Sequence, residues 1–333
     1  IARGHIDEET LEIIIPEQTL IPFDVPKFVD NMSYESLVIK GDRVYGLFEA
    51  YGDSLIKNPY VLSVNVSGKD IKKHMDNKLI KLDRLGAVTL VTLNRPEALN
   101  ALSTELRNTI SSTFDLLAKD SQTQVIVLTG AGRAFSVGLD LKELGGEIDK
   151  KDKSLARDVE VSITEVGKPV IGAVNGFAIT GGFELALMCD FLIATPNAKF
   201  ADTHARVGVV PGWGLSQKLP RLIGINRAKE LSLTGNFLDA ENAMNWGLVN
   251  RVVEEKELIS VCIELAQDIA STDPATRAEI RRIMDSGWLS TLHDGLKWEK
   301  EANRIHSKKH RPETEVAARR QNIQARGRSQ ADG

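Results

Sequence analysis

From about residue 79 onward, short apolar runs alternate with stretches whose apolar residues recur at helical spacing. The apolar runs, each bounded by glycine, proline or polar residues, predict buried strands at 87–96, 124–130, 169–176 and 190–195. Between the first two runs, Ser103 precedes apolar residues at helical spacing and predicts a capped helix over 103–120. From Asn226 onward the pattern is helical nearly throughout. Strands that are apolar on both faces and alternate with helices indicate α/β layers.

The first 78 residues follow a different pattern. Three prolines in the stretch 16–26 exclude a long helix there. Apolar stretches around Gly41 and Asp42 predict a hairpin, and the stretch 60–70 predicts another strand. No catalytic constellation is visible in this part. We therefore expect three regions, namely a β-rich or partly irregular N-terminal extension of unknown role (1–78), a core (79–270) and a C-terminal helical region (271–333), whose polar end we expect to fray.

Composition narrows the class of protein. Of the 333 residues, 42% are hydrophobic and 26% are charged, which is typical of a globular chain with a large core. A formal net charge of -4 provides no basic field for nucleic acid. No apolar run approaches the ~20 residues that a membrane helix needs. We therefore expect neither a nucleic-acid partner nor membrane insertion.

The two cysteines, Cys189 and Cys262, lie in apolar helical patterns. Two are too few for a disulfide framework or a zinc cluster, so we expect buried free thiols in a reducing, intracellular compartment. The chain begins with Ile1, so a targeting peptide is not judged from it. Its last residues differ from a Ser-Lys-Leu peroxisomal signal. Mitochondrial, peroxisomal and cytoplasmic locations all stay open.

Several familiar motifs fail on inspection. The stretch GAGRAFSVG begins like a dinucleotide-binding loop, but Phe135 stands where the third glycine is required, and no phosphate-binding lysine and serine follow. Ser216 lacks the second glycine of a nucleophile elbow. His306 and His310 are four residues apart on a predicted helix, but the lysines between them favour a solvated face over a metal pair. We expect no metal site.

Two glycine-bearing turns at strand ends carry the remaining chemistry. One is the turn at 137–140, and in the other Gly181 and Gly182 open a helix with Glu184 in its first turn. Glycine lets backbone N–H groups approach a ligand, and a helix N-terminus adds exposed donors and a partial positive charge. Two such N–H groups on one oxygen would form an oxyanion hole. Alternatively, the glycines only form turns and Glu184 only compensates the helix dipole.

Five stretches of the sequence carry a family resemblance. In order they are LNRPEALNALS, GAGRAFSVGLDLKEL, KPVIGAVNGFAITGGFELALMCD, AKFADTHARVGVVPGWGLSQKLPRLIG and AKELSLTG. Over about residues 78–328 the chain resembles the enoyl-CoA hydratase/isomerase (crotonase) superfamily, and within it a plant peroxisomal-type branch. The resemblance implies a crotonase (ClpP-like) spiral of ββα turns, with C-terminal helices that form a homotrimer or a hexamer. It implies an acyl-CoA substrate from fatty acid metabolism and no separate cofactor, because coenzyme A is part of the substrate.

The resemblance also implies a site, position by position. The backbone N–H groups of Leu139 and Gly181 would bind the thioester oxygen. The coenzyme A pocket would be lined by Asn94, Arg95, Ala98, Leu99, Asp140, Leu141 and Lys142. Phe183 and Trp213 are candidates for the acyl pocket, although a place in the core is the commoner fate of such aromatic residues.

The two acid–base positions of the family are occupied by different residue types. Glu184 matches the first family glutamate, which activates water, but His204 stands at the second. A His204 imidazolium, with a pKa raised by Glu184 and with Asp202 orienting its other nitrogen, would donate a proton in place of a carboxylic acid. Alternatively, His204 points away from the substrate and water on Glu184 carries both transfers.

These residues favour hydration of a 2-trans-enoyl-CoA with Glu184 as the base. Thioester hydrolysis and double-bond isomerisation stay open, because one fold hosts several reactions. The missing second glutamate argues against the isomerase. A non-catalytic acyl-CoA-binding protein is the alternative outside the enzymes.

Overall fold

The computed structural model describes residues 78–146, 158–309 and 312–331, together with the backbone of five strands in the first 65 residues. The chain divides into two compact units, Ile1–His74 and Met75–Gly333. This division falls near the boundary that we expected at residue 78. The proline-rich stretch 16–26 and His310 lie outside the described residues.

The first unit contains short antiparallel strands. They are β1 (His5–Ile6) paired with β2 (Ile13–Ile14), and a three-stranded sheet of β3 (Met32–Lys40), β4 (Arg43–Ala50) and β5 (Tyr60–Asn65). β3 and β4 pair Lys40 with Arg43, so the hairpin predicted around Gly41 and Asp42 is confirmed. The strand predicted from Tyr60 is confirmed as β5, which pairs with β4.

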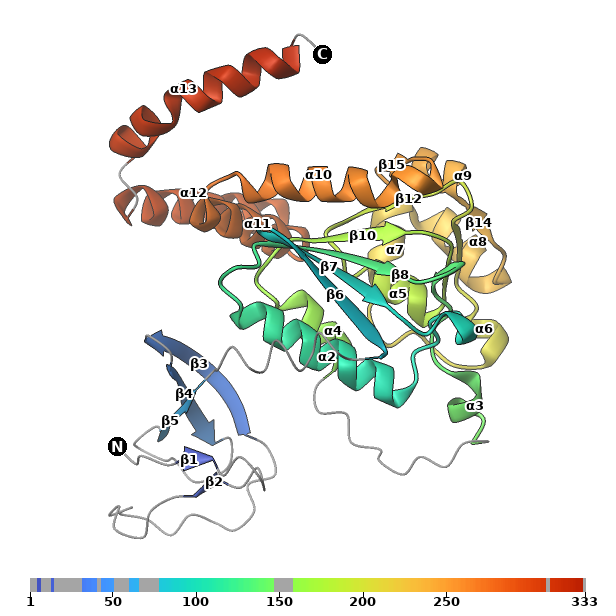
Figure 1. Ribbon diagram of the computed structural model, residues 1–333. Coiled ribbons are helices and arrows are strands. Elements are labelled where there is room, and N and C mark those ends of the chain that lie inside the picture. Colours follow the sequence, from blue (N-terminus) through green and yellow to red (C-terminus); the bar gives the residue numbers. More distant parts are fainter. Residues whose placement is uncertain are drawn as a thin grey trace. The chain divides into compact units, whose positions relative to one another are not determined.

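The larger unit centres on a six-stranded sheet with the order β15-β12-β10-β8-β7-β6 (Figure 1). Its strands are β6 (Ile80–Leu85), β7 (Val88–Leu93), β8 (Val125–Gly130), β10 (Val170–Val174), β12 (Phe191–Ala194) and β15 (Arg251–Val252). Neighbouring strands are parallel except in the β6–β7 hairpin. β8 and β10 are buried along their whole length, which is why their sequences are continuous apolar runs.

A smaller four-stranded sheet comes between strands of the larger sheet and the helices that follow them in the sequence. Its order is β14-β13-β11-β9, and its strands are β9 (Ala134–Ser136), β11 (Phe177–Ile179), β13 (Lys199–Ala201) and β14 (Leu238–Asp239). β8 leads to β9, β10 to β11 and β12 to β13, and a helix follows each pair. These helices are α3 (Leu141–Leu144), α5 (Gly181–Ala186) and α6 (His204–Val207). The strand–strand–helix repeat is the ββα spiral that we expected.

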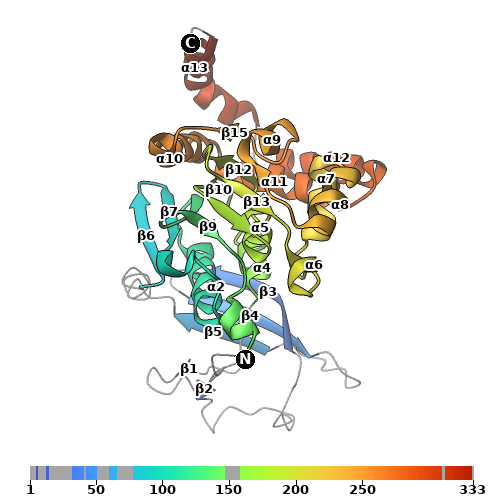
Figure 2. The ribbon, with the colours of Figure 1, turned by 90° about the vertical axis from the view of Figure 1, so that its right-hand side faces the viewer.

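Helices cover both faces of the larger sheet. α2 (Thr104–Lys119) and α4 (Val159–Thr164) lie side by side on one face, where their apolar residues join the main core (Figure 2). α10 (Leu258–Ala270) covers the opposite face through a second apolar cluster. α2 begins where the Ser103 hydroxyl accepts a hydrogen bond from the Leu106 N–H at 3.2 Å, so the predicted cap is confirmed.

From Asn226 onward most of the described chain is helical, as predicted. Besides α10, the helices there are α8 (Ile225–Thr234), α9 (Ala240–Asn245), η2 (Glu255–Glu257), α11 (Pro274–Trp288), α12 (Leu292–Lys309) and α13 (Pro312–Ala331), whereas η1 (Pro96–Ala98) and α7 (Leu215–Ile223) come earlier in the chain. The exceptions are β14 and β15, which the helical pattern concealed. No helix in the described parts of the chain is long and apolar enough to cross a membrane.

The polar C-terminal end, which we expected to fray, forms the helix α13, which continues to Ala331. Arg319 lies 2.9 Å from Asp273, and Arg326 lies 2.9 Å from Asp268 of α10. These ion pairs connect the helix to residues far away in the sequence, so the pattern of the tail itself does not reveal them.

Both cysteines are free, as expected. Cys262 is buried in α10, and burial raises the pKa of its thiol to about 12. Cys189 differs from the expectation, because it follows the end of α5 and is only partly buried as a residue. Burial of its sulfur still raises the pKa of the thiol far above the usual range. Since the thiolate is the reactive form, neither cysteine is a nucleophile at neutral pH.

Candidate active site

The chain enters α5 through an unusual turn. Thr180 precedes the helix with φ 54° and ψ -114°, a conformation that glycine usually adopts. Gly181 and Gly182 follow, and Glu184 lies one turn into the helix with 3% of its surface exposed. Because the helix begins at Gly181, its first N–H groups have no carbonyl partner within the helix.

The second glycine turn lies directly against the start of α5. Gly138 has φ +86°, and a Cβ atom there would lie 2.8 Å from the backbone nitrogen of Gly181. A Cβ atom on Gly181 would in turn lie 3.5 Å from the backbone nitrogen of Leu139. Neither amide donates a backbone hydrogen bond to any residue in the described part of the chain. The structure therefore brings the Leu139 and Gly181 amides together and leaves both able to bind a ligand oxygen.

Gly182 sets how closely α5 approaches β9. A Cβ atom at this position would lie 1.9 Å from the carbonyl oxygen of Ser136, so the helix start would have to move. We expect Gly182→Ala to lower the free energy of unfolding, measured by urea denaturation, by about 3 kcal/mol. Gly212→Ala is the matched control, because nothing lies within 4 Å of a Cβ atom there. Equal stability of the two variants would contradict this packing argument.

The Glu184 carboxyl group is held from two sides. Its Oε1 accepts a hydrogen bond from the backbone N–H of Trp213 at 2.8 Å and a longer one from that of Leu215 at 3.5 Å. Its Oε2 lies 3.4 Å from Nε2 of His204. The start of α7 therefore fixes one oxygen of Glu184 and leaves the other facing His204.

His204 begins α6 and is bound by the residue two positions before it. Its Nδ1 lies 2.6 Å from Oδ1 of Asp202, which also accepts a hydrogen bond from the His204 backbone N–H at 3.2 Å. Both side chains are buried. Burial alone would lower the pKa of the imidazole, but the hydrogen bonds to Asp202 and Glu184 outweigh it and raise this pKa to about 9. At neutral pH the ring is therefore an imidazolium.

The charge of Asp202 complements that of His204. Burial opposes ionisation of the Asp202 carboxyl, but hydrogen bonds from His204 and Ser232 hold its pKa below the usual value. The two side chains therefore form a buried pair of opposite charges. Removing either partner would leave an uncompensated charge in the interior.

Arg95, in the segment expected to line the coenzyme A pocket, forms an ion pair with Asp140 in the Leu139 turn. Nη1 of Arg95 lies 2.6 Å from Oδ2 of Asp140 and 3.0 Å from the carbonyl oxygen of Ala101. The other oxygen of Asp140 accepts a hydrogen bond from the Lys142 N–H at 3.0 Å and caps α3. The Asp140 carboxylate therefore serves to hold the turn in place.

The remaining residues expected to line this pocket make different local contacts. Ala98 ends η1, and Leu99 closes it in the left-handed region with φ 53° and ψ 34°. The Asn94 side chain donates a hydrogen bond to the carbonyl oxygen of Lys78 at 2.7 Å. Leu141 is 64% exposed at the start of α3. An exposed apolar side chain two residues after Leu139 is suited to contact a ligand.

The two aromatic candidates for the acyl pocket lie in different places. Phe183 is fully buried and packs on Phe200 with a distance of 5.4 Å between ring centroids. This is the core position that the sequence analysis left open. Trp213 is partly buried, with its ring 3.5 Å from the place of a Cβ atom on Gly181, and its Nε1 donates to Asp158 at 3.3 Å. The structure thus brings Trp213, and not Phe183, to the paired amides.

Three residues at the site escaped the sequence analysis. Asp158 reaches Trp213 across 55 positions, and no local pattern shows such a contact. Thr180 and Thr203 bind each other through their hydroxyl groups. Only Thr180 had a signal in the sequence, because it is a threonine directly before the two glycines of a turn.

Of the two histidines near the C-terminus, the structure describes only His306. His306 Nε2 lies 3.0 Å from the hydroxyl oxygen of Thr276. Within the described ranges, no group of three or more histidine, cysteine, aspartate or glutamate side chains could hold a metal ion.

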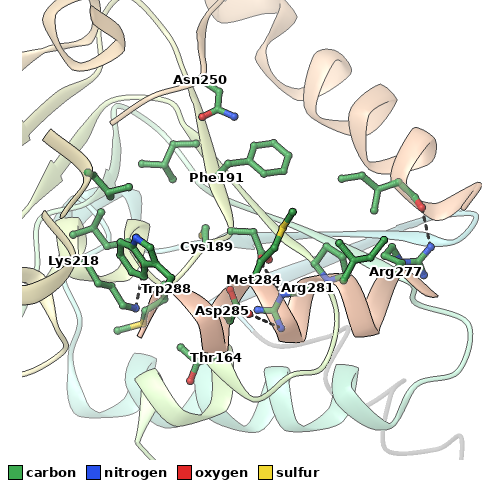
Figure 3. Close-up of a pocket in the computed structure, with 18 of the residues that line it drawn as sticks. Thr164, Cys189, Phe191, Lys218, Asn250, Arg277, Arg281, Met284, Asp285 and Trp288 are labelled. Atoms are coloured by element: carbon green, nitrogen blue, oxygen red, sulfur yellow. Dashed lines mark hydrogen bonds and ion pairs between the residues drawn. The ribbon is translucent and has the colours of Figure 1, made fainter. Parts of the chain in front are cut away.

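A cavity of about 1270 Å³ lies apart from the paired amides, between the end of α5, β12 and α11 (Figure 3). Its wall is mostly apolar and includes Trp288. Arg281 reaches across to Asp190, with a distance of 2.6 Å. Neither Glu184 nor His204 lines this cavity. Glu184 and His204 therefore lie outside this cavity, although Ala186 of the same helix lines it.

Known proteins resemble most of the larger unit. The family model described as enoyl-CoA hydratase/isomerase matches residues 83–318. A probable peroxisomal enoyl-CoA hydratase 1 of Arabidopsis thaliana is 42% identical over 216 residues, which are 65% of this chain and 82% of the relative. A probable mitochondrial enoyl-CoA hydratase of Dictyostelium discoideum is 40% identical over 220 residues, which are 66% of this chain and 79% of the relative.

Solved structures share the same fold. An enoyl-CoA hydratase from Bacillus anthracis has a TM-score of 0.67 and 36% identity, and the match covers 73% of this chain and 96% of that one. A hydratase subunit from Geobacillus kaustophilus has a TM-score of 0.66 and 33% identity, with coverage of 74% and 95%. Each solved chain is thus matched over nearly its whole length.

Proposed function

The chain belongs to the enoyl-CoA hydratase/isomerase family, and from this premise we propose how its site adds water to a 2-trans-enoyl-CoA thioester. It is an enzyme of the enoyl-CoA hydratase type, a hydro-lyase with the crotonase fold and an acyl-CoA substrate. One observation supports the residue roles proposed here. The buried Glu184, whose Oε2 lies 3.4 Å from His204, lies one helical turn after Gly181, which carries one of the paired amides.

Water addition to the conjugated thioester moves negative charge onto the thioester oxygen. We assign the binding of this oxygen to the backbone N–H groups of Leu139 and Gly181. Their glycine turns hold them as neighbours before the substrate arrives, so little reorganisation is needed. The N-terminus of α5 adds a partial positive charge at the same place.

Glu184 is the proposed base. Since the backbone N–H groups of Trp213 and Leu215 hold its Oε1, the Oε2 atom takes up the proton as the water oxygen attacks the β-carbon of the acyl chain. The carboxyl group is buried, which keeps it from being surrounded by competing solvent.

His204 is the proposed acid, which delivers a proton to the α-carbon. An imidazolium with a pKa of about 9 holds its proton at neutral pH and still releases it to a developing carbanion. The Asp202 carboxylate behind the ring balances the positive charge, so that the pair is neutral as a whole. A neutral carboxylic acid carries the same charge. This balance explains how a histidine can take the place of the second family glutamate.

An absorbance assay tests the proposed reaction. With 2-trans-butenoyl-CoA, we expect the absorbance of the conjugated enoyl thioester to fall without release of the coenzyme A thiol. Release of the thiol would indicate thioester hydrolysis instead. Octenoyl and dodecenoyl thioesters should be run in parallel. No absorbance change with any of them, at protein concentrations that bind coenzyme A, would contradict hydration.

We also propose that the chain assembles as a homotrimer or as a dimer of trimers. The helices α11 and α12 expose large apolar side chains, namely Met284, Trp288, Leu289, Leu292, Leu296 and Trp298. Contact with further copies would remove this apolar surface from water. Sedimentation equilibrium should then give three or six times the chain mass of 36.6 kDa, and a monomer would contradict the assembly.

A further inference from the structure

Thr180 adopts a backbone conformation that its residue type disfavours. Its φ of 54° and ψ of -114° match the first central position of a type II′ turn, which glycine normally occupies because it has no Cβ atom. A β-branched residue is especially stiff there. Leu99 also has a positive φ, but its ψ of 34° places it in the ordinary left-handed region. The strain at Thr180 is therefore of a rarer kind and needs a compensating contact.

A residue from the next turn of the spiral holds the Thr180 side chain. The hydroxyl groups of Thr180 and Thr203 bind each other, and Oγ1 of Thr180 also accepts a hydrogen bond from the Thr203 N–H at 3.3 Å. The Thr180 backbone is held as well. Its N–H donates to the Ala201 carbonyl at 2.8 Å, and its carbonyl accepts from the Glu184 N–H at 2.9 Å. A glycine at this position would keep the backbone bonds and lose both side-chain bonds.

These contacts join the two elements that carry the reacting groups. Thr180 directly precedes Gly181, and Thr203 directly precedes His204. The ψ angle of Thr180 rotates the peptide that contains the Gly181 N–H. An ordinary extended or helical ψ would turn this N–H in a different direction. The strained angle is therefore coupled to the direction of one of the two paired amides.

We propose that Thr180 is a positioning residue, whose strained backbone, held by the Thr203 hydroxyl, aims the Gly181 N–H at the thioester oxygen. The proposal rests on the function proposed above. It explains why a threonine stands where glycine would be unstrained. The hydroxyl pair holds the oxygen-binding amide at a constant distance from His204, and a glycine would leave this distance to the flexibility of the turn.

Three substitutions separate the hydroxyl from the backbone. Thr180→Ser keeps the hydroxyl. Thr180→Ala removes the hydroxyl but keeps the Cβ atom that disfavours this backbone conformation. Thr180→Gly removes both the hydroxyl and the Cβ atom. The probe is butanoyl-CoA with an isotope label in the thioester carbonyl, which has no double bond to hydrate. Its carbonyl stretching frequency, measured by infrared difference spectroscopy, falls as hydrogen bonds to the oxygen strengthen. This readout reports on the amides without turnover.

We expect the lowered carbonyl frequency in the wild type and in Thr180→Ser, loss of most of this shift in Thr180→Ala, and partial recovery in Thr180→Gly. The kcat for 2-trans-butenoyl-CoA should follow the same order, falling about 10- to 100-fold in Thr180→Ala with KM little changed. Thr203→Val should reproduce the loss without altering the strained residue, and it serves as the test if Thr180→Ala does not fold. Thr195→Ala, which removes a hydroxyl bonded to the Asn175 carbonyl, is the control and should leave the frequency unchanged.

Equal carbonyl frequencies in the wild type and Thr180→Ala would overturn the proposal. So would equal losses in Thr180→Ala and Thr180→Gly, because the orientation of the peptide would then not be the cause. A wild-type protein that lowers the frequency and does not hydrate butenoyl-CoA would count against the proposed function alone. A wild type that binds butanoyl-CoA with no frequency shift would remove the role of the Gly181 amide and this proposal with it.

Discussion

Glu184→Gln is expected to hydrate 2-trans-butenoyl-CoA about 10³-fold more slowly than the wild type, because proton transfer by a positioned base contributes on the order of 10²–10⁴-fold. The glutamine keeps the size of the side chain, and its carbonyl oxygen can still accept the hydrogen bond from Trp213 that Oε1 accepts at 2.8 Å. It cannot take up a proton. The position is 3% exposed, so no alternative base from solvent replaces the carboxylate.

Binding measurements separate lost chemistry from a lost site. The thioester oxygen is bound by backbone amides, so the Kd of butanoyl-CoA, measured by calorimetry, should change less than about threefold in Glu184→Gln. Glu279→Gln is the matched control, because Glu279 belongs to a surface ion pair with Arg282. Its kcat should equal that of the wild type. A Glu184→Gln variant with kcat within about tenfold of the wild type would show that another group is the base.

The second large effect concerns the proton on His204. Only the imidazolium can donate a proton, and a pKa raised to about 9 keeps this form dominant below that pH. The fraction of imidazolium falls as the pH rises through this value, so kcat should fall about tenfold per pH unit above it. His204→Gln should lower kcat by about 10²-fold and remove this alkaline limb. Steady-state rates at saturating substrate across the range would show both effects.

Asp202 determines where this limb lies. Its carboxylate accepts the hydrogen bond from Nδ1 of His204 at 2.6 Å and raises the pKa of the imidazole. Asp202→Asn removes that charge, so the limb should move to lower pH and kcat at neutral pH should fall. An alkaline limb at the same pH in Asp202→Asn would mean that Asp202 does not control the charge on His204.

A charge exchange tests the pair as a unit. In His204→Glu, proton donation would create a second carboxylate beside the buried Asp202, and repulsion between like charges at such a site opposes this step. This single variant should be about as slow as His204→Gln. Adding Asp202→Asn removes the repulsion and leaves one carboxyl group facing Glu184. The double variant should then exceed the single one by at least about tenfold in kcat. Equal rates would contradict the charge balance.

Local sequence patterns were sufficient to predict the helices and strands whose formation depends mainly on their own residues. β7, β8, β10 and β12 were predicted because strands in a sheet covered on both faces must be apolar along their length. Ser103 marked the start of α2, because a capping hydroxyl binds an N–H three positions away. β14 and β15 were missed, since each exists through pairing with a distant strand. The contacts of α13 were missed for the same kind of reason, because its ion pairs reach back to the start of α11 and to α10.

The chain's local order placed Gly181 at a helix start and Glu184 one turn later, because a spacing of three residues is fixed within any helix. The contact of Gly181 with the Leu139 turn, and the 3.4 Å between Glu184 and His204, became known only from the packed spiral. These distances join different turns of the chain. They depend on how β9, β11 and β13 lie side by side, and hydrogen bonding across strands together with close packing of glycine surfaces sets that spacing.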